Sequence, residues 1–361
     1  MRLRGGERLL VRIPAWLGDA VMAEPLLRAL RPWCDGGELS GGVTLAGPGA
    51  LLDLFHETLP GAKLLPMSKS EPFELRSWRG HDVALLLTGS FRSAWMAWRA
   101  GISERIGWQR DGRGLLLTSS AVPARERGGV PFGCGVRGRS PRYLPRAFGA
   151  SCVELGGLLG VAVTDTRPQL HATVQERSDV FNRLTSSGID PLEPFLLLNA
   201  GGRSNSSKLV PAPFWTESIK ELRRNVDLPV VIVAGFNEEQ QAEACGQSIP
   251  GSVVLTDPIA KLPELLALCA TARLVLTGDV GPRHLAVASG ADLVCVLAST
   301  DPRHTADFLE RTRIIRGVVS CGPCHRDICP KSGALQNRCM TELTPASVAS
   351  AALELLQSPS K

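Results

Sequence analysis

An aspartate stands where the first apolar segment of the chain turns toward a helix. Residues 9–13 are mostly apolar, Pro14 and Gly18 interrupt the segment, and Asp19 opens an apolar-periodic stretch. This order is typical of a strand, a turn and a helix, so we expect Asp19 at the carboxyl end of a parallel sheet, where open α/β folds bind ligands. A carboxylate there can take a proton from a substrate. In the alternative interpretation, Asp19 only caps the helix.

A stretch of small residues in the second half of the chain ends in a lysine. After the apolar residues 195–198, the chain reads Asn-Ala-Gly-Gly-Arg-Ser-Asn-Ser-Ser-Lys and reaches Lys208. Glycines, hydroxyl side chains and a lysine after a strand suit the binding of phosphate oxygens, although the spacing is not that of a Walker motif. We expect Ser206 and Ser207 to donate to the same phosphates as Lys208.

Two further strand ends carry acidic residues. Residues 230–234 run into Glu238 and Glu239, and a carboxylate there can accept two hydrogen bonds from ribose hydroxyls. In the alternative, these glutamates only favour the first turn of a helix through its dipole. After residues 274–276 the chain reads Thr-Gly-Asp-Val-Gly-Pro-Arg-His, so Asp279 precedes a helix N-terminus that suits a diphosphate.

Strands and helices are expected to alternate along the whole chain. The expected strands cover residues 8–13, 42–46, 83–88, 195–198, 230–234, 252–255, 274–276 and 293–297. The expected helices cover residues 20–30, 51–55, 92–100, 143–159, 174–187, 214–224, 239–247, 262–271, 284–289 and 345–357. This alternation indicates parallel sheets with helices on both faces. A chain of 361 residues exceeds the usual size of one hydrophobic core, so we expect two domains.

The net charge of +5 is unevenly distributed. Residues 91–150 hold eleven arginines, no lysine and three acidic residues, and residues 123–142 within them are expected to form a long loop. An arginine excess of this kind suits a phosphate-rich or anionic-lipid partner, or in the alternative only a solvated surface. A nucleic-acid-binding protein would place stacking aromatic residues among the arginines. We expect Trp95 and Trp98 to lie in the core instead, because they fall on an apolar helix.

Ten cysteines fall into two groups. Six are scattered among apolar or small residues and are expected to be buried thiols. The other four follow the pattern C-x2-C-x4-C-x9-C and are Cys321, Cys324, Cys329 and Cys339. They could close a structural zinc site, but the spacing lacks the regularity of zinc ribbons, so we expect reduced thiols. Because no apolar run reaches the ~18 residues of a membrane span and no secretory signal is evident, we expect a cytoplasmic protein.

Three segments resemble the ADP-heptose:lipopolysaccharide heptosyltransferases of glycosyltransferase family 9. They are VRIPAWLGDAVMAEPLLRALR near the N-terminus, residues 85–118, and residues 274–302 with the cysteine-bearing segment that follows. The resemblance implies a GT-B fold, with two Rossmann-like, doubly wound α/β domains facing a central cleft. Residues 1–185 would form the acceptor-side domain and residues 186–343 the domain that binds the ADP-sugar. Residues 344–361 would form a last helix that packs back on the first domain.

The resemblance also implies the reaction and its residues. It implies an inverting transferase that needs no cofactor or metal and moves heptose from ADP-L-glycero-D-manno-heptose to the inner core of lipopolysaccharide, most like the members that add the second heptose. Asp19 would be the base and Lys208 would stabilise the leaving diphosphate. The donor-binding residues would be Ser206, Ser207, Lys208, Glu238, Glu239, Asp279, Val280, Gly281 and His284. The acceptor-binding residues would be Ser90, Arg92 and Arg105.

The implied partners follow from that acceptor. Because the acceptor is lipid-linked and anionic, the enzyme would meet the inner leaflet of the membrane peripherally, and no nucleic acid is implied. Gly278 and Val280 depart from the Asn and Thr usual in the family. Two alternatives therefore stay open: a family member with another sugar or acceptor, and a nucleotide-sugar-binding protein with weak or no turnover.

Overall fold

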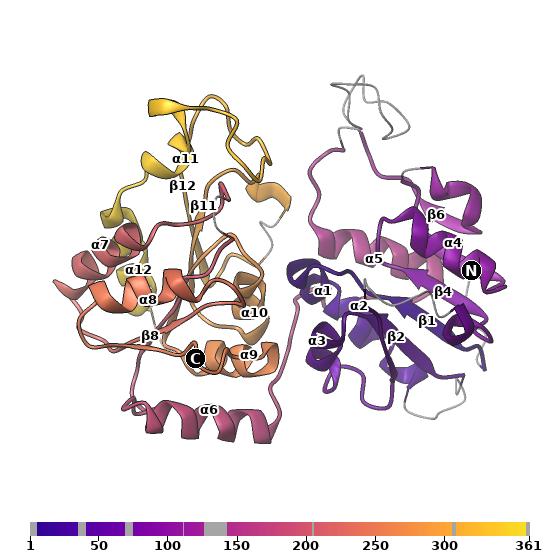
Figure 1. Cartoon of the computed structure of the whole chain (residues 1–361). Coiled ribbons are helices and arrows are strands. Elements are labelled where there is room, and N and C mark those ends of the chain that lie inside the picture. Colours follow the sequence, from indigo (N-terminus) through magenta and orange to yellow (C-terminus); the bar gives the residue numbers. More distant parts are fainter. Residues whose placement is uncertain are drawn as a thin grey trace. The chain divides into compact units, whose positions relative to one another are not determined.

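The chain folds into two compact α/β units (Figure 1). The computed structural model describes residues 6–34, 41–68, 75–110, 112–125, 143–203, 206–304 and 308–358. The first unit is Met1–Pro168 and the second is Gln169–Lys361. The division falls earlier than the boundary expected after residue 185, because α6 (Val174–Ser186) packs on α9 (Leu262–Thr271) of the second unit, with an ion pair between Arg183 and Glu264.

The first unit is built around one parallel sheet with the strand order β3-β2-β1-β4-β5-β6. Its strands are β1 (Leu9–Arg12), β2 (Val43–Gly47), β3 (Lys63–Pro66), β4 (Val83–Leu86), β5 (Glu104–Trp108) and β6 (Ser119–Ala121). Its helices are α1 (Leu17–Met22), α2 (Glu24–Ala29), α3 (Gly49–Leu52), α4 (Phe91–Arg99) and α5 (Phe148–Leu159), with short helical turns η1 (Arg31–Trp33), η2 (Asp53–Phe55), η3 (Leu75–Trp78) and η4 (Arg113–Leu116).

The second unit repeats this architecture with the strand order β12-β11-β10-β7-β8-β9, again parallel throughout. Its strands are β7 (Leu196–Asn199), β8 (Val230–Val233), β9 (Ser252–Val254), β10 (Leu274–Gly278), β11 (Leu293–Leu297) and β12 (Thr312–Arg316). Besides α6 and α9, its helices are α7 (Ala212–Arg223), α8 (Glu239–Ser248), α10 (Pro282–Ser289), α11 (Arg338–Thr341) and α12 (Pro345–Leu356), with short turns η5 (Pro302–His304) and η6 (Gly333–Leu335).

Each sheet has one point where the direction of strand addition reverses. In the first unit this point lies between β1 and β4, and in the second between β7 and β10. Ligands of open α/β sheets bind outside the carboxyl ends of the strands at such points. Asp19 follows β1 and Arg92 follows β4, while Lys208 follows β7 and Asp279 follows β10. Each unit therefore places two candidate residues beside its own reversal point.

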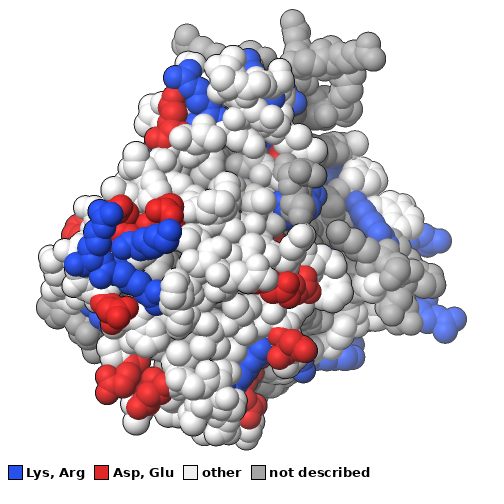
Figure 2. Space-filling view, turned by 60° about the vertical axis from the view of Figure 1, so that its left-hand side comes forward, with Lys and Arg blue, Asp and Glu red and all other residues white. Residues whose placement is uncertain are grey.

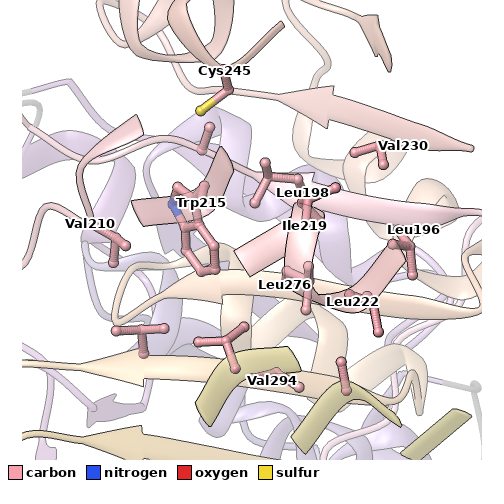
Figure 3. Close-up of a cluster of buried hydrophobic side chains, with 14 of the residues drawn as sticks. Leu196, Leu198, Val210, Trp215, Ile219, Leu222, Val230, Cys245, Leu276 and Val294 are labelled. Atoms are coloured by element: carbon pink, nitrogen blue, oxygen red, sulfur yellow. The ribbon is translucent and has the colours of Figure 1, made fainter. Parts of the chain in front are cut away.

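The core of the second unit holds its site-bearing strands in place. Leu196 and Leu198 of β7, Val230 of β8, Leu276 of β10 and Val294 of β11 turn their side chains into one buried cluster (Figure 3). α7 covers this cluster with the ring of Trp215, which is 1% exposed, and with two further apolar side chains, Ile219 and Leu222. α12 packs beside α7 and buries five side chains in the same core, which are Val348, Ala349, Ala351, Ala352 and Leu355. The last helix thus belongs to the second unit.

Several expected elements differ in the structure. The helix expected over residues 20–30 is two helices, α1 and α2, which meet at Ala23. The strands β3, β5, β6 and β12 were not expected. Charged residues such as Glu104 interrupt the apolar pattern of β3, β5 and β12, and β6 is a short segment that reads Ser-Ser-Ala. The prediction that Trp95 and Trp98 lie in the core is wrong, since they are 39% and 50% exposed. α4 instead turns its small side chains toward the sheet, where Ala94 and Ala97 join a buried cluster.

Charged side chains are dispersed over the face seen in Figure 2, where basic and acidic groups lie in small sets separated by uncharged surface. Within the described ranges, no helix is long and apolar enough to cross a bilayer. Most of the arginine-rich loop expected over residues 123–142 lies outside the described residues.

Candidate active site

Asp19 lies in the first turn of α1, beyond the carboxyl end of β1. The N-cap of α1 is Trp16, so Asp19 is not the capping residue that the alternative interpretation required. Its side chain is half-buried. Burial and the negative charge of Asp19 together raise the pKa of Cys152 on α5, which places the carboxylate near a thiol that stays neutral. The structure therefore puts Asp19 at the sheet edge that the strand-turn-helix pattern predicted.

Two arginines lie beside the reversal point of the first unit. Arg12 ends β1, and Arg92 stands in the first turn of α4. Burial and the charge of Arg92 lower the pKa of Arg12 to about 10, so the Arg12 guanidinium stays charged at neutral pH. The Nη1 atom of Arg12 donates to the carbonyl oxygens of Ile13 (2.5 Å) and Ala46 (3.2 Å), which hold it at this edge. Two nearby positive charges favour an anionic ligand. No motif singles out Arg12 in the sequence.

Ser90 fixes the start of α4. It is the N-cap, and its Oγ atom accepts a hydrogen bond from the backbone nitrogen of Ser93 (3.2 Å). The fully buried Arg113 supports this turn, because its Nε donates to the carbonyl oxygen of Trp108 (2.7 Å) and its Nη1 to that of Ser90 (3.2 Å). Ser90 and Arg92 are therefore held together at one end of α4.

Arg105 lies elsewhere in the first unit. It pairs with Ala84 in the register of β4 and β5, near the amino end of the sheet. From that level to Leu86, at the carboxyl end of β4, the chain rises about 7 Å. The Nε atom of Arg105 donates to the carbonyl oxygen of Leu116 (2.6 Å) and its Nη1 to that of Ile102 (2.5 Å). The structure thus does not bring Arg105 together with Ser90, and its acceptor-binding role stays a prediction.

The carboxylate of Asp279 is the centre of a buried charge group in the second unit. Its side chain is 7% exposed and pairs with two cations: Lys208 Nζ lies 3.3 Å from Oδ2, and Arg283 Nη1 lies 2.9 Å from Oδ1. Burial alone would raise the pKa of Asp279, but the charges of Arg283 and Lys208 outweigh it and hold the pKa at about 2. The side chain of Lys208 is 39% exposed, so this lysine contacts the buried carboxylate and is also accessible to solvent.

The turn between β10 and α10 is held by its own backbone. The nitrogen of Val280 donates to the carbonyl oxygen of Gly278 (2.9 Å), and the nitrogen of His284 donates to that of Gly281 (3.0 Å), which is the N-cap of α10. The positive end of the helix dipole lies at this turn, which suits a phosphate group. Burial and the charge of Arg283 lower the pKa of His284 to about 3, so its imidazole is neutral near pH 7.

Ser206 and Ser207 attach the lysine-bearing loop to the segment that follows β12. The Oγ atom of Ser206 donates to Asp327 Oδ1 (3.0 Å), and that of Ser207 to the carbonyl oxygen of Arg326 and to Ser299 Oγ (2.9 Å). Both side chains are buried. In this structure the two serines therefore fix the position of the loop that carries Lys208. A direct hydrogen bond from either hydroxyl to phosphate stays a prediction.

The structure distinguishes the two candidate glutamates. Glu238 is the N-cap of α8, and its Oε2 accepts a hydrogen bond from the backbone nitrogen of Gly235 (3.1 Å). This carboxylate also lies against Gly201, where an added Cβ would be 2.2 Å from Oε2. Glu238 thus bridges the carboxyl ends of β8 and β7, on the side of the Lys208 loop, while Glu239 begins α8. No signal in the sequence separates the two positions.

The four clustered cysteines line one cavity of about 220 Å³ in the second unit. They are Cys321, Cys324, Cys329 and Cys339, and all nine described cysteines are free thiols. Burial raises the pKa of Cys339, and electrostatic repulsion from the neighbouring cysteine sulfurs adds to this effect. Across the described ranges, no group of three or more His, Cys, Asp or Glu side chains is arranged to hold a metal ion. The donor set therefore does not fit a metal in this geometry.

Comparison with known proteins decides the family. The family described as "Glycosyltransferase family 9 (heptosyltransferase)" matches residues 75–131 and 141–334, which is more than half of the chain. The chain belongs to glycosyltransferase family 9. The matched residues of this glycosyltransferase include all the second-unit candidates from Ser206 to His284, whereas Asp19 precedes them.

Curated relatives cover most of the chain. Lipopolysaccharide heptosyltransferase 2 of Escherichia coli (strain K12) is 24% identical over 337 residues, which covers 86% of this glycosyltransferase and 88% of the relative. Lipooligosaccharide heptosyltransferase 2 of Haemophilus influenzae is 22% identical over 325 residues, with 85% and 88% covered.

Solved structures agree in fold. The structure of E. coli ADP-heptose lps heptosyltransferase II has a TM-score of 0.69 at 21% identity and covers 97% of this chain and 98% of its own. E. coli heptosyltransferase WaaC with ADP-2-deoxy-2-fluoro heptose has a TM-score of 0.65 at 15% identity, with 96% and 99% covered. The iron-containing heptosyltransferase TibC of E. coli has a TM-score of 0.54 at 16% identity, with 98% and 77% covered. This family 9 glycosyltransferase therefore has the expected GT-B type of fold.

Proposed function

We propose that this glycosyltransferase moves heptose from ADP-L-glycero-D-manno-heptose to the inner core of lipopolysaccharide, with inversion at the transferred carbon. The observation that supports donor binding by the second unit is the charge group of Lys208, Asp279 and Arg283 at the reversal point of its sheet. It supplies a partly exposed cation beside a helix N-terminus, and developing negative charge on a leaving diphosphate is stabilised by such groups.

Each donor-side residue has a distinct part in this proposal. Lys208 and the backbone around Gly281 bind the diphosphate, and Glu238 accepts hydrogen bonds from the ribose hydroxyls. Asp279 holds Lys208 through their 3.3 Å ion pair and contacts the sugar hydroxyls. The neutral imidazole of His284 adds a hydrogen-bond donor at the same helix without adding charge.

The acceptor side supplies the base. A hydroxyl oxygen of the acceptor forms the new bond to the anomeric carbon, and the bond from that carbon to the diphosphate oxygen breaks, with its electron pair leaving on ADP. The carboxylate of Asp19 takes the proton of the attacking hydroxyl. Arg12 and Arg92, with Ser90 at the same edge, bind anionic groups of the inner core and so orient the acceptor.

In this proposal transfer requires no metal ion, because Lys208 and the dipole of α10 carry the positive charge that the departing diphosphate needs. The enzyme acts in the cytoplasm and meets the inner leaflet of the membrane peripherally, where its lipid-linked acceptor is embedded. Transfer activity in excess EDTA tests the first statement, and a loss of activity that added metal restores would contradict it.

The test of the reaction is heptose transfer from ADP-heptose to a heptosylated, Kdo-bearing lipid A acceptor, followed by mass spectrometry. The wild type is expected to add one heptose. Asp19→Asn removes the base and is expected to lower kcat by about 10²- to 10⁴-fold, and Lys208→Met by about 10²- to 10³-fold. Asp53→Asn and Lys220→Met, which change exposed groups of the same types, are the controls and are expected to keep wild-type rates.

A product without added heptose would overturn the proposal, as would full activity in Asp19→Asn. The departures at Gly278 and Val280 favour one alternative, a family member that uses another sugar or acceptor. Binding of ADP-heptose and of other ADP-sugars, measured by calorimetry beside transfer, separates that alternative from a protein that binds nucleotide sugars without turnover.

A further inference from the structure

The outer face of α4 carries large aromatic side chains that the fold does not bury. Phe91, Trp95 and Trp98 are 50%, 39% and 50% exposed. Their spacing of four and then three residues puts them on one side of the helix. The opposite side, with Ala94 and Ala97, packs against the sheet. α4 therefore has two apolar faces, of which the one with the larger side chains points away from the core.

A neighbouring turn carries a further exposed apolar side chain. η4 packs beside α4, and its Leu115 is 96% exposed. We call Phe91, Trp95, Trp98 and Leu115 the aromatic face. Monomeric proteins rarely expose several large apolar side chains side by side unless the patch binds something.

Exposed arginines lie on α4 and on the turn η3 that packs beside it. Arg92 and Arg99 on α4 are exposed, and α4 holds no acidic residue. Arg76 and Arg79, also exposed, come from η3 and the residue after it, and η3 packs beside α4. The surface around the helix is thus positively charged, and its natural complement is negative.

We propose that the aromatic face of α4 docks on the surface of an anionic lipid bilayer. Tryptophan and phenylalanine side chains insert at the level of the lipid headgroups, while arginines keep their charge among the phosphates and cover apolar surface with their stems. The inference deepens the proposed peripheral encounter with the membrane and rests on it. Ser90 caps α4, so docking brings the acceptor-side residues Ser90 and Arg92 within about one helical turn of the headgroups.

The test is cosedimentation of the full chain with phosphatidylcholine vesicles, with and without about one third phosphatidylglycerol. Binding is expected to require the anionic lipid and to weaken as salt is raised. Trp95→Ser/Trp98→Ser is expected to weaken binding about tenfold or more, because two aromatic side chains no longer leave water. Arg99→Gln is expected to weaken it about fivefold. The matched control is Val174→Ser/Leu192→Ser, which removes two exposed apolar side chains from the second unit and is expected to bind like wild type.

Three outcomes overturn the inference. Equal binding of the double tryptophan variant and the wild type would show that another surface docks. Absence of wild-type binding to either vesicle would overturn both the membrane encounter and the aromatic face. Retention of a single-stranded oligonucleotide through Trp95 and Trp98 in place of vesicles would assign the face to nucleic acid.

A parallel measurement keeps this proposal separate from the proposed reaction. Transfer to a detergent-dispersed acceptor is expected to stay within about twofold of wild type in Trp95→Ser/Trp98→Ser, since catalysis does not need the bilayer once the acceptor is dispersed. Absence of transfer by the wild type would contradict the proposed reaction and would leave the docking proposal unaffected. Loss of transfer in the double variant alone, with vesicle binding kept, would give the aromatic face a part in acceptor binding and overturn the docking proposal.

Discussion

Replacing Asp279 with asparagine tests whether the buried charge group makes the free energy of unfolding of the second unit depend on pH in acid. The carboxylate of Asp279 has a pKa of about 2 because Arg283 and Lys208 outweigh the effect of burial. An asparagine of nearly the same size keeps the shape of the turn but removes the charge. The variant therefore isolates the electrostatic contribution of one carboxylate.

The magnitude follows from the pKa difference between the two states. An unfolded aspartate titrates near pH 3.9, and each unit of pKa difference is worth about 1.4 kcal/mol, so the depressed pKa contributes roughly 2.5 kcal/mol. Because the pKa is lower in the folded state, this contribution is complete above about pH 4 and is lost as the pH falls toward 2. Asp279 is 7% exposed, so solvent screening removes little of it.

The assay is urea-induced unfolding of the full chain at about pH 6 and about pH 2.5, followed through amide exchange of peptides from β10 and α10. Acidification is expected to lower the free energy of unfolding in both proteins. We expect the loss in Asp279→Asn to be about 2 kcal/mol smaller than the loss in wild type. The control is Asp227→Asn, since the Asp227 side chain is 85% exposed in its pair with Arg223 and contributes little. Equal pH dependence of Asp279→Asn and wild type, within about 0.5 kcal/mol, would refute the reasoning.

Three further predictions concern single contacts. Gly201→Ala places a Cβ 2.2 Å from Glu238 Oε2, so it is expected to displace that carboxylate and weaken ADP binding about tenfold in calorimetry, and unchanged affinity would remove Glu238 from the nucleotide site. Arg113→Leu removes a fully buried guanidinium and leaves the carbonyl groups that accept its hydrogen bonds without a donor. It is expected to destabilise the first unit by about 3 kcal/mol in thermal unfolding, and a wild-type melting temperature would contradict this. Thr173→Ala removes the capping box that Thr173 forms with Glu176 and should cost about 1 kcal/mol by urea titration; no loss would mean that the cap is replaced by water.

The central strands could be predicted from the sequence because strands buried on both faces read as continuous apolar runs. β7, β8, β10 and β11 are all fully buried and all fall where strands were expected. The strands that were missed carry charge or exposure. β12 has Arg313 and Arg316 at a sheet edge, and β5 begins with Glu104 and Arg105. A half-buried strand of this kind lacks the apolar run on which prediction depends.

The orientation of α4 could not be predicted, because its sequence has two apolar faces at helical spacing. Packing chooses between them: the small side chains of Ala94 and Ala97 let the helix approach the sheet, and Trp95 and Trp98 then face outward. Periodicity identifies the faces of a helix but not the one that is buried.

The candidate site was predictable in its positions and not in its pairings. Lys208 and Asp279 follow strands, so their edge of the sheet could be anticipated, and the structure brings them within 3.3 Å of each other. That Arg283 completes the charge group, or that Arg12 lies near Arg92, depends on tertiary contacts between residues that share no motif. The same holds for Glu238, whose contact with Gly201 comes from neighbouring strands far apart in the sequence.

Glycine at position 278 has a physical reason in this fold. A Cβ at Gly278 would lie 3.3 Å from Val210 Cγ2 and 3.5 Å from the carbonyl oxygen of Lys208, so a larger residue would press on the lysine-bearing loop. With glycine there, the loop rests against the end of β10 and Lys208 reaches Asp279. Glycine at position 278 is thus coupled to the placement of the Lys208 cation beside Asp279. At position 280 the backbone makes the hydrogen bonds of the turn, and nothing in the structure explains the choice of valine.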